Sequence, residues 1–409
     1  MMRWRGSAGC GAMSDINAVR GNNTNRWGID LNKKLLFFVT EDWFVCSHWL
    51  PHMTAAREAG YEVYVVTRVR QHRSIIEARG VHVVPLELSR RGRNPIAELK
   101  VIAELIRIYR EIRPDLVKHI AMKPIVYGTI AALFTRPRAV VNYIAGRGWL
   151  FTSDSVKARL LRPVVKWLLR WVLNRGHVIV ENPNDLREML GLGLVPERIT
   201  RIPGAGVDMK VFLPTAEPDG PPLVVMAARM LWAKGVGEFV AAAELLKAEG
   251  VRARFVLVGS PDGENPSSVS VEQLEAWEKN GLVEWWGRRD DMPAVFKQAH
   301  IVCLPTSYGE GIPKVLIEAA ASGRAIIATE IPGCREIVRH GENGFLVPIR
   351  NPVALAGAMR KLIVSKPLRE RMGTSGRKIA QAGFSVEHVI AQTLAVYRGL
   401  LDGGPRLEG

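Results

Sequence analysis

Short apolar runs alternate with amphipathic stretches along most of the chain. Leu35–Thr40 is a continuous apolar run behind two lysines, and Glu62–Thr67 and Val81–Pro85 follow the same pattern, which is typical of buried parallel strands. In Asn94–Ile112 the apolar residues recur at helical spacing, with Pro95 near the start, and this pattern predicts an amphipathic helix. Strands that alternate with helices predict a doubly wound, parallel α/β sheet.

The alternation ends near residue 202 and begins again after a linker. Pro214–Pro222 is rich in proline, and such a cluster separates structural units. A chain of 409 residues is also too long for a single core. We therefore expect a disordered extension at 1–32, an N-terminal Rossmann-like domain at 33–213 and a second Rossmann-like domain at 221–384, facing the first across a cleft. A C-terminal helix at 385–402 is expected to join the first domain.

The expected strands and helices can be given by their residues. Further strands of the first domain are predicted at Asp115–His119, Ala139–Tyr143, Val178–Val180 and Ile199–Ile202. Those of the second domain are predicted at Leu223–Ala227, Arg254–Val258, Val283–Trp286, Ile301–Pro305, Ala325–Thr329 and Phe345–Val347. Additional helices are predicted at His52–Gly60, near Ile125–Phe134, at Glu238–Glu249 and at Pro293–Gln298.

The charge of the chain is unevenly distributed. The formal net charge is +16, and 33 of the 56 Lys and Arg but only 18 of the 40 Asp and Glu lie in residues 1–215. A basic half indicates an anionic partner, either nucleic acid or anionic lipid. No apolar run is long enough for a signal peptide or a spanning helix, so secretion and membrane insertion are not expected. The four cysteines lack metal-site spacing and indicate reduced thiols in a cytosolic compartment.

Two carboxylates flank one strand–loop–helix junction. Glu310 lies in the loop after the apolar run Ile301–Pro305, and Glu318 lies inside the helix that follows. Parallel sheets bind ligands at the carboxyl ends of their strands, and Gly309 and Gly311 allow the backbone to approach a ligand closely. These residues alone leave three alternatives open: an acid/base dyad, a metal site and a solvated helix face.

Two cations follow another strand of the same predicted sheet. Arg229 and Lys234 come after Leu223–Ala227, just before a helix that starts near Gly235. Fixed cations in this position suit a diphosphate that gains charge as it leaves. Solvated surface cations are common, but the shared sheet edge with Glu310 favours a binding site.

In combination, these residues resemble the donor domain of retaining family-4 glycosyltransferases with the GT-B fold. The motifs that carry the resemblance are Arg229…Lys234-Gly235, Gly287-Arg-Arg-Asp-Asp291, Leu304-Pro-Thr-Ser, Glu310-Gly-Ile-Pro…Glu318-Ala, Pro332-Gly-Cys-Arg-Glu336 and Gly341-Glu-Asn-Gly-Phe-Leu-Val-Pro348. The first half is similar to the capsule and O-antigen branch of that family, through Thr40-Glu-Asp-Trp-Phe, Ser47-His48, Lys123-Pro124, Gly146-Arg-Gly148 and Ile202-Pro-Gly-Ala-Gly-Val-Asp208. The resemblance covers roughly residues 33–402.

The resemblance implies a role for each motif. Arg229 and Lys234 would bind the diphosphate of a nucleotide sugar, Glu310 the hydroxyls of its sugar and Glu318 those of its ribose. The sugar and phosphate would contact the donor loop and helix start at Gly311, Ile312, Pro313, Lys314 and Val315, and the base would lie near Gly287 and Arg288. UDP is the expected carrier. No cofactor or metal is expected, because the cations take the role of a divalent ion, and Asp290 and Asp291 are expected to cap a helix.

The N-terminal half departs from the family pattern at one strand. The family usually has Val-His-x-His there, whereas this chain has Val117-Lys118-His119-Ile120. His119 is therefore a candidate catalytic residue that contacts the donor, and a purely structural histidine is an equally open alternative. His48 and Lys123 are expected to face the cleft on the acceptor side.

A basic segment without acids stands out in the first domain. Residues 155–175 carry the basic side chains Lys157, Arg159, Arg162, Lys166, Arg170 and Arg175 among leucines, valines and two tryptophans. Such a helix is typical of an interfacial membrane anchor, and a core helix with a solvated basic face is the alternative. Arg90-Arg91-Gly-Arg93 adds a second basic patch.

The leading hypothesis is an enzyme that acts at the cytoplasmic face of the inner membrane. It would move a sugar, with retention, from a nucleotide sugar to a polyprenyl-diphosphate-linked acceptor, with an anionic membrane surface as a partner. A soluble or different lipid acceptor remains the alternative within this class. A nucleic-acid-binding protein is disfavoured because no recognised module is present. A dinucleotide oxidoreductase is disfavoured because Glu41-Asp42-Trp43 replaces the glycine-rich turn after the first strand.

Overall fold

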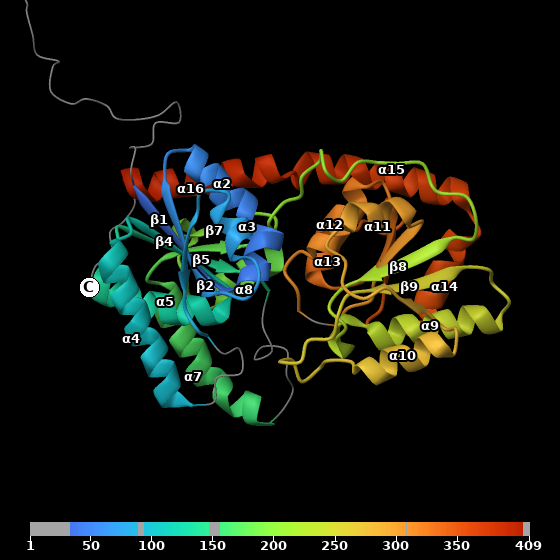
Figure 1. The fold of residues 1–409 in the computed structure, drawn as a ribbon, viewed down its shortest axis with the longest axis horizontal. Coiled ribbons are helices and arrows are strands. Elements are labelled where there is room, and N and C mark those ends of the chain that lie inside the picture. Colours follow the sequence, from blue (N-terminus) through green and yellow to red (C-terminus); the bar gives the residue numbers. More distant parts are fainter. Residues whose placement is uncertain (1–32, 89–93, 147–155, 308, 404–409) are drawn as a thin grey trace, which may run out of the picture.

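Two α/β domains lie side by side, and long helices run along the top of both (Figure 1). This computed structural model describes residues 33–88, 94–146, 156–307 and 309–403, with the backbone alone for 156–162 and 164. Each domain contains one fully parallel sheet with helices on both faces. The predicted fold class of two facing Rossmann-like domains is thus confirmed. The extension expected at 1–32 and the basic patch at 90–93 lie outside the described residues.

The first sheet contains seven strands in the order β3-β2-β1-β4-β5-β6-β7. Its central strands β4 and β5 are buried at every position, although β4 carries Lys118 and His119 and β5 carries Asn142 among their apolar residues. The strands are β1 (Lys34–Glu41), β2 (Glu62–Arg68), β3 (His82–Pro85), β4 (Leu116–Ile120), β5 (Ala139–Ile144), β6 (His177–Val180) and β7 (Ile199–Arg201).

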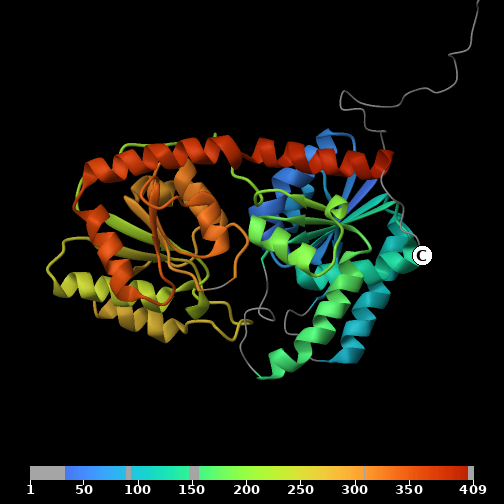
Figure 2. The ribbon, with the colours of Figure 1, turned by 180° about the vertical axis from the view of Figure 1, so that it is seen from behind.

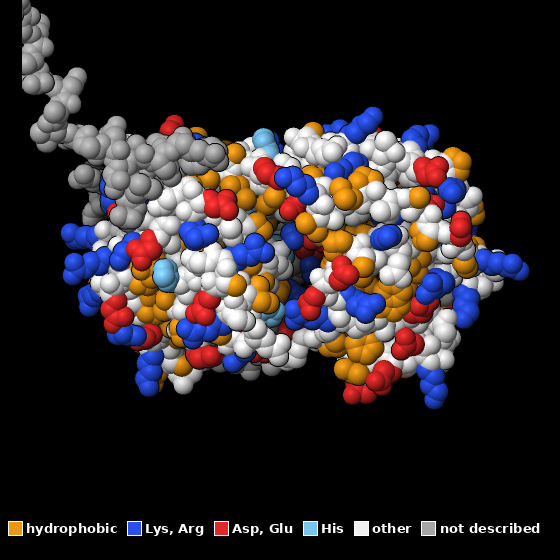
Figure 3. Space-filling view, turned by 45° about the horizontal axis from the view of Figure 1, so that its top comes forward, with side chains coloured by type: hydrophobic (Ala, Val, Ile, Leu, Met, Phe, Trp, Pro, Cys, Tyr) orange, Lys and Arg blue, Asp and Glu red, His pale blue; other side chains and the backbone are white. Residues whose placement is uncertain are grey.

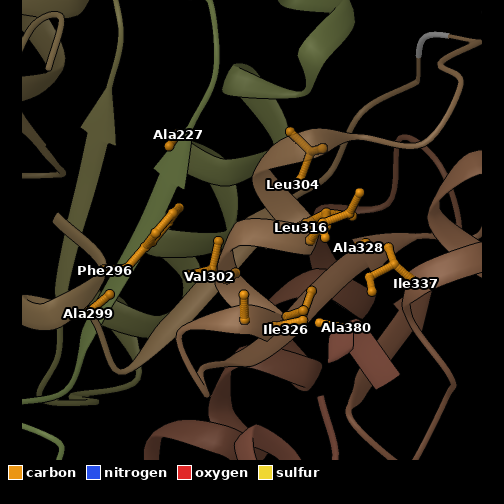
Figure 4. Packing of buried hydrophobic residues seen from close by; sticks show 14 of the residues in the cluster. Ala227, Phe296, Ala299, Val302, Leu304, Leu316, Ile326, Ala328, Ile337 and Ala380 are labelled. Atoms are coloured by element: carbon orange, nitrogen blue, oxygen red, sulfur yellow. The ribbon is translucent and has the colours of Figure 1, made fainter. Parts of the chain in front are cut away.

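The second sheet contains six strands in the order β10-β9-β8-β11-β12-β13. The strands are β8 (Leu223–Ala227), β9 (Arg254–Val258), β10 (Glu284–Trp285), β11 (Ile301–Leu304), β12 (Ala325–Thr329) and β13 (Gly344–Val347). On one face, Val302 and Ile326 pack against helical side chains such as Phe296, Leu316 and Ala380 (Figure 4). Burial of these side chains supplies the main favourable free energy of this domain.

Helices cover both faces of the first sheet. One face packs against the π-helix η1 (Val45–Trp49), α2 (Leu50–Glu58), α3 (Arg73–Glu77) and the C-terminal α16 (Val386–Asp402). The other face packs against α4 (Pro95–Ile112), α5 (Met122–Thr135), α7 (Val156–Leu173) and α8 (Pro183–Gly191). The short α1 (Asp42–Phe44) and the 3-10 helix η2 (Pro196–Arg198) complete this domain.

The second sheet is covered in the same way. One face carries α11 (Met292–Gln298), α12 (Lys314–Ala321), α13 (Pro332–Ile337) and α15 (Lys366–Gly383). The other face carries α9 (Val236–Ala248), α10 (Val271–Lys279) and α14 (Pro352–Ile363), and the 3-10 helix η3 (Trp232–Lys234) follows β8. From behind, α15 and α16 are seen to run in sequence from the second domain to the first (Figure 2).

The structure differs from the predicted elements mainly at their ends. Helix α2 begins at Leu50 rather than at His52, because the preceding π-helix places Pro51 in the first helical turn. The predicted strand Val283–Trp286 forms only the two-residue strand β10, which pairs with β9 alone at the edge of its sheet.

Candidate active site at the domain cleft

The order of the second sheet brings the predicted site residues together. Strands β8 and β11 are neighbours in space but not in sequence, so the topological switch point of this sheet lies between them. Arg229 and Lys234 follow β8, and Glu310 follows β11. In open α/β sheets, ligands bind beside such a switch point at the carboxyl ends of the strands. A hollow with Lys or Arg side chains within it lies between the domains (Figure 3).

Lys234 and Glu310 form an ion pair in this site. Lys234 Nζ lies 2.6 Å from Glu310 Oε1, and the two side chains are only 15% and 14% exposed. The turn that holds Lys234 is tightly packed, because a Cβ on Gly235 would lie 2.1 Å from the carbonyl oxygen of Pro305, and Gly235 has a φ of +85°. Any other residue at 235 would therefore shift Lys234 away from the end of β11.

The donor loop ends at the N-terminus of α12. Pro313 occupies the N-cap position, and Lys314 and Val315 begin the helix. Lys314 Nζ lies 2.8 Å from Glu318 Oε1, one turn further along. Positive helix-dipole charge and exposed N–H groups favour an anion at such an end.

Arg229 is also paired. Its Nη1 donates to Asp262 Oδ2 at 2.8 Å, and the Asp262 side chain is only 9% exposed. Asp262 belongs to the loop after β9, and its backbone N–H donates to the Ser268 hydroxyl. No local pattern predicts this pairing, because the two residues are 33 positions apart.

Gly287 and Arg288 lie at the rim of the second domain. Gly287 has a φ of +65° and its carbonyl accepts from the N–H of Gly259. Arg288 lies 2.9 Å from Asp290 and also contacts His72 of the first domain at 3.5 Å. Asp291 accepts from the N–H of Ala294 and so caps α11 as expected, whereas Asp290 pairs with Arg288 and does not cap this helix.

His48 lies on the first-domain side of the cleft, opposite the cations of the second domain. The π-helix after β1 positions this ring, and Ser47 Oγ lies 2.7 Å from His48 Nδ1. Enclosure of the ring lowers its pKa to about 3, with further lowering by Lys314 and Lys234. His48 therefore lies near the cations of the second domain and is neutral at physiological pH.

His119 lies in the core rather than in the cleft. Its side chain is fully buried, Tyr109 OH lies 3.0 Å from Nε2, and Asn142 Oδ1 lies 2.8 Å from Nδ1. Burial lowers the pKa of the ring to about 4. A Cβ on Gly128 of α5 would lie 2.4 Å from the ring, so the ring fills the space under this helix. The geometry favours the structural alternative for His119 over contact with the donor.

Lys118 is an unexpected feature of the same strand. Its side chain points to the opposite face of the sheet, is fully buried, and its Nζ has no hydrogen-bond partner among the described residues. Four aromatic rings surround the amine at 4.5–5.8 Å, those of Phe37, Trp49, Tyr143 and Tyr397. Burial lowers the pKa of Lys118 to about 7.

Lys123 pairs with an acid of the first domain, and two cations of the basic helix are exposed. Lys123 Nζ pairs with Glu98 of α4 at 3.0 Å, which fixes it against a neighbouring helix. Lys166 and Arg170 are exposed on α7. The side chains of Lys157, Arg159 and Arg162 lie outside the described part of the structure.

One further residue of the cleft was not predicted. Glu181 follows β6, is 6% exposed, and accepts a hydrogen bond from the backbone N–H of Ile312 in the opposite domain. Its other carboxylate oxygen accepts from Tyr143 OH at 2.8 Å. A glutamate after a strand carries no signal of such a contact, because its partner lies 131 residues away.

Comparisons with known proteins identify the family. The family model described as "Glycosyl transferases group 1" matches residues 211–379, and "Glycosyl transferase 4-like" matches residues 34–181. The N,N'-diacetylbacillosaminyl-diphospho-undecaprenol alpha-1,3-N-acetylgalactosaminyltransferase of Campylobacter jejuni is 30% identical over 358 residues, which are 84% of this chain and 92% of the relative.

Two further comparisons agree. The capsular polysaccharide biosynthesis glycosyltransferase CapM of Staphylococcus aureus is 22% identical over 84% of this chain and 92% of its own. The structure of Anabaena HepE in complex with UDP and glucose has a TM-score of 0.73 at 20% identity and covers 90% of this chain and all of its own, which shows the same fold. The chain therefore belongs to the family-4 glycosyltransferases, is a glycosyltransferase, and has the GT-B fold.

Proposed function

We propose that this glycosyltransferase moves a sugar from a UDP-linked donor to a polyprenyl-diphosphate-linked saccharide, with retention at the anomeric carbon. The observation that carries this proposal is the Lys234–Glu310 pair at the switch point of the second sheet. This pair combines a cation for the diphosphate with a carboxylate for sugar hydroxyls. Both are held by short turns at adjacent strand ends.

The donor would enter a site whose charges are already balanced. Lys234, Lys314 and Arg229 each have a carboxylate partner within 2.6–2.8 Å. A diphosphate would replace or share these partners, and the sugar hydroxyls would donate to the carboxylate of Glu310. Exchange of one anion for another requires little rearrangement, which preorganises the site for a charged leaving group.

The chemistry needs no metal in this proposal. The acceptor hydroxyl would attack the anomeric carbon from the face that the diphosphate leaves, and the bond from that carbon to the phosphate oxygen would break. The hydroxyl proton would pass to the departing phosphate oxygen. Lys234 and Arg229 would stabilise the negative charge that develops on the diphosphate.

The acceptor class follows from the relatives. The Campylobacter jejuni relative is named for transfer onto a diphospho-undecaprenol-linked sugar, and the Staphylococcus aureus relative for capsular polysaccharide synthesis. Anabaena HepE has been solved with UDP, which supports UDP as the carrier.

A membrane-facing surface of the first domain supports a lipid-linked acceptor. The first turns of α4 and α7 lie at the same end of this domain in both views (Figures 1 and 2). Ile96 and Leu99 in the first turns of α4 are 66% and 65% exposed, and Trp167 on α7 is 65% exposed between Lys166 and Arg170. Exposed apolar side chains among cations suit the headgroup region of an anionic membrane. Among the described residues, no helix has the length and low charge needed to cross a bilayer.

A substrate screen tests this proposal. UDP-, GDP- and dTDP-linked sugars would be screened by thermal shift, and those that bind would then be supplied with polyprenyl-diphosphate saccharides in anionic vesicles. We expect release of UDP and a product with the anomeric configuration of the donor, as read by NMR. An inverted product would refute retention, and turnover restricted to water-soluble acceptors would refute the lipid-linked class.

A further inference from the structure

Glu181 connects the two domains at the donor loop. Glu181 follows β6 of the first domain. It accepts a hydrogen bond from the N–H of Ile312, which belongs to the loop before α12 of the second domain. Tyr143 holds the other oxygen of the carboxylate at 2.8 Å, and the ring of Tyr143 packs edge-on against Trp49 at 4.6 Å. The carboxylate is therefore oriented by rigid, buried groups of the first domain.

The fit between Glu181 and the loop leaves no spare room. A Cβ on Gly311 would lie 2.0 Å from Glu181 Oε2, and its three nearest atoms would all belong to Glu181. Gly146 of the first domain makes a second close approach, because its Cβ would lie 2.8 Å from the carbonyl oxygen of Gly309. The first domain thus touches the donor loop on both sides of Glu310.

A buried carboxylate in this position is energetically unfavourable unless it is hydrogen-bonded. The pKa of Glu181 is raised to about 7, chiefly by burial and also by the nearby acids Asp185 and Glu310, while the hydrogen bonds from Ile312 and Tyr143 act in the opposite direction. An apolar side chain would fill this position at a lower cost. The two hydrogen bonds therefore point to a role for the carboxylate in positioning the loop.

We propose that Glu181 is a positioning residue, which fixes the donor loop against the acceptor domain and thereby sets where the Glu310 carboxylate lies. The proposal rests on the function proposed above. Glu310 is two residues from Ile312, so a shift of that peptide moves the carboxylate relative to Lys234. Because the contact spans both domains, it also sets the distance between the donor sugar and an acceptor held on the first domain.

Replacement of Glu181 separates positioning from other roles. Glu181→Ala removes both hydrogen bonds, whereas Glu181→Gln keeps an oxygen that accepts from Ile312. A displacement of about 1 Å can lower a rate about 100-fold, so we expect kcat to fall by about that factor in Glu181→Ala and by less than about 10-fold in Glu181→Gln. The KM for the donor should rise less than kcat falls. Glu197→Ala, which removes an exposed acid of the same domain, is the matched control.

Gly311→Ala provides a second, independent test. Its added methyl group meets only Glu181 at close range, so the variant should lose activity in the wild-type background. In the Glu181→Ala background the methyl group has room, and the second substitution should add little further loss. Losses that simply multiply in the double variant would overturn the proposal.

Hydrogen exchange tests the contact without knowledge of the substrate. The N–H of Ile312 should exchange slowly in the wild type and in Glu181→Gln, and faster in Glu181→Ala, while β11 exchanges at the same rate in all three. Failure of the wild type to glycosylate any polyprenyl acceptor would count against the proposed function, and exchange at Ile312 would still decide the positioning role. Three results would each overturn the positioning role of Glu181. They are unchanged hydrogen exchange at Ile312 in Glu181→Ala, unchanged kcat in Glu181→Ala, and equal inactivity of the folded Glu181→Gln and Glu181→Ala variants.

Discussion

The two domains differ in how they hold their basic side chains. In the second domain, Lys234 and Lys314 are paired with carboxylates on neighbouring turns. In the core of the first domain, Lys118 and His52 are buried, and burial lowers the pKa of Lys118 to about 7 and that of His52 to about 3. The first domain also carries most of the net positive charge of the chain, but the His48 ring on its side of the cleft has a pKa lowered to about 3.

We therefore propose that the two domains bind different parts of the substrates. Paired ions can exchange partners with a diphosphate, so the donor side suits a charged ligand. A neutral surface of low dielectric constant on the first domain strengthens the electrostatic interactions opposite to it and can accommodate a sugar hydroxyl. Cations of the first domain such as Lys166 and Arg170 are instead exposed on α7, where we propose that they contact an anionic membrane. Substitutions in each part of the molecule test this difference.

The donor pair should be the most sensitive part of the molecule. Lys234→Ala and Glu310→Ala should each lower kcat/KM by about 100- to 1,000-fold, because each removes a group that contacts the leaving diphosphate or the sugar. Initial rates of UDP release would measure this loss, with circular dichroism to show that the variants fold. Rates within threefold of wild type in either variant would refute the assignment of that residue.

The outer surface should control membrane binding alone. Lys166→Glu with Arg170→Glu should reduce binding to anionic vesicles by at least about 30-fold, since the loss of each cation near such a surface alone removes about 1 kcal/mol. Vesicle sedimentation at several salt concentrations would measure it. The thermal shift that UDP produces should stay unchanged. Undiminished binding of the double variant would place the membrane contact elsewhere, and a salt-sensitive gel shift with DNA would revive the nucleic-acid alternative.

The buried amine should destabilise the first domain in a pH-dependent way. Because the pKa of Lys118 is lowered to about 7 in the folded state, the unfolded state binds more protons between pH 7 and about 10, and the free energy of unfolding rises with pH across this range. Lys118→Met should remove this rise and stabilise the protein at pH 7 by about 1–3 kcal/mol. Chemical denaturation at pH 7 and pH 9.5 would show it. A variant that is less stable than wild type at pH 7 would show that the aromatic cage favours the charged amine.

His119 should affect stability and leave donor binding unchanged. His119→Phe leaves Tyr109 OH and Asn142 Oδ1 without this partner in the core, which costs about 1–3 kcal/mol. UDP affinity and the donor KM should stay within twofold of wild type. A selective rise of the donor KM in a stably folded variant would instead support the donor-contact alternative.

Much of the fold could be predicted from the sequence. Buried parallel strands such as Leu223–Ala227 and Ala325–Thr329 appear as uninterrupted apolar runs, and the structure has them with the same bounds. The donor site could be placed because its residues come directly after strands, and strand ends of one sheet share an edge. These patterns are local, so they can be recognised in a single sequence.

The remaining features depend on distant parts of the chain. Lys118 stands where the family pattern has a histidine, and only its position on β4 shows that its side chain lies in the core between the sheet and α16. Glu181 and Asp262 are ordinary acids in loops, and only the folded chain brings them to Ile312 and Arg229. The π-helix that positions His48 has no recognisable pattern in five residues.

Calorimetric titration with UDP tests the difference between the two sides of the cleft most directly. Wild type, Lys234→Ala and Lys118→Met would be titrated at the same pH and salt concentration. We predict that Lys234→Ala weakens UDP binding at least 10-fold, whereas Lys118→Met leaves it within twofold. Equal affinities of wild type and Lys234→Ala, or a loss confined to Lys118→Met, would contradict the account.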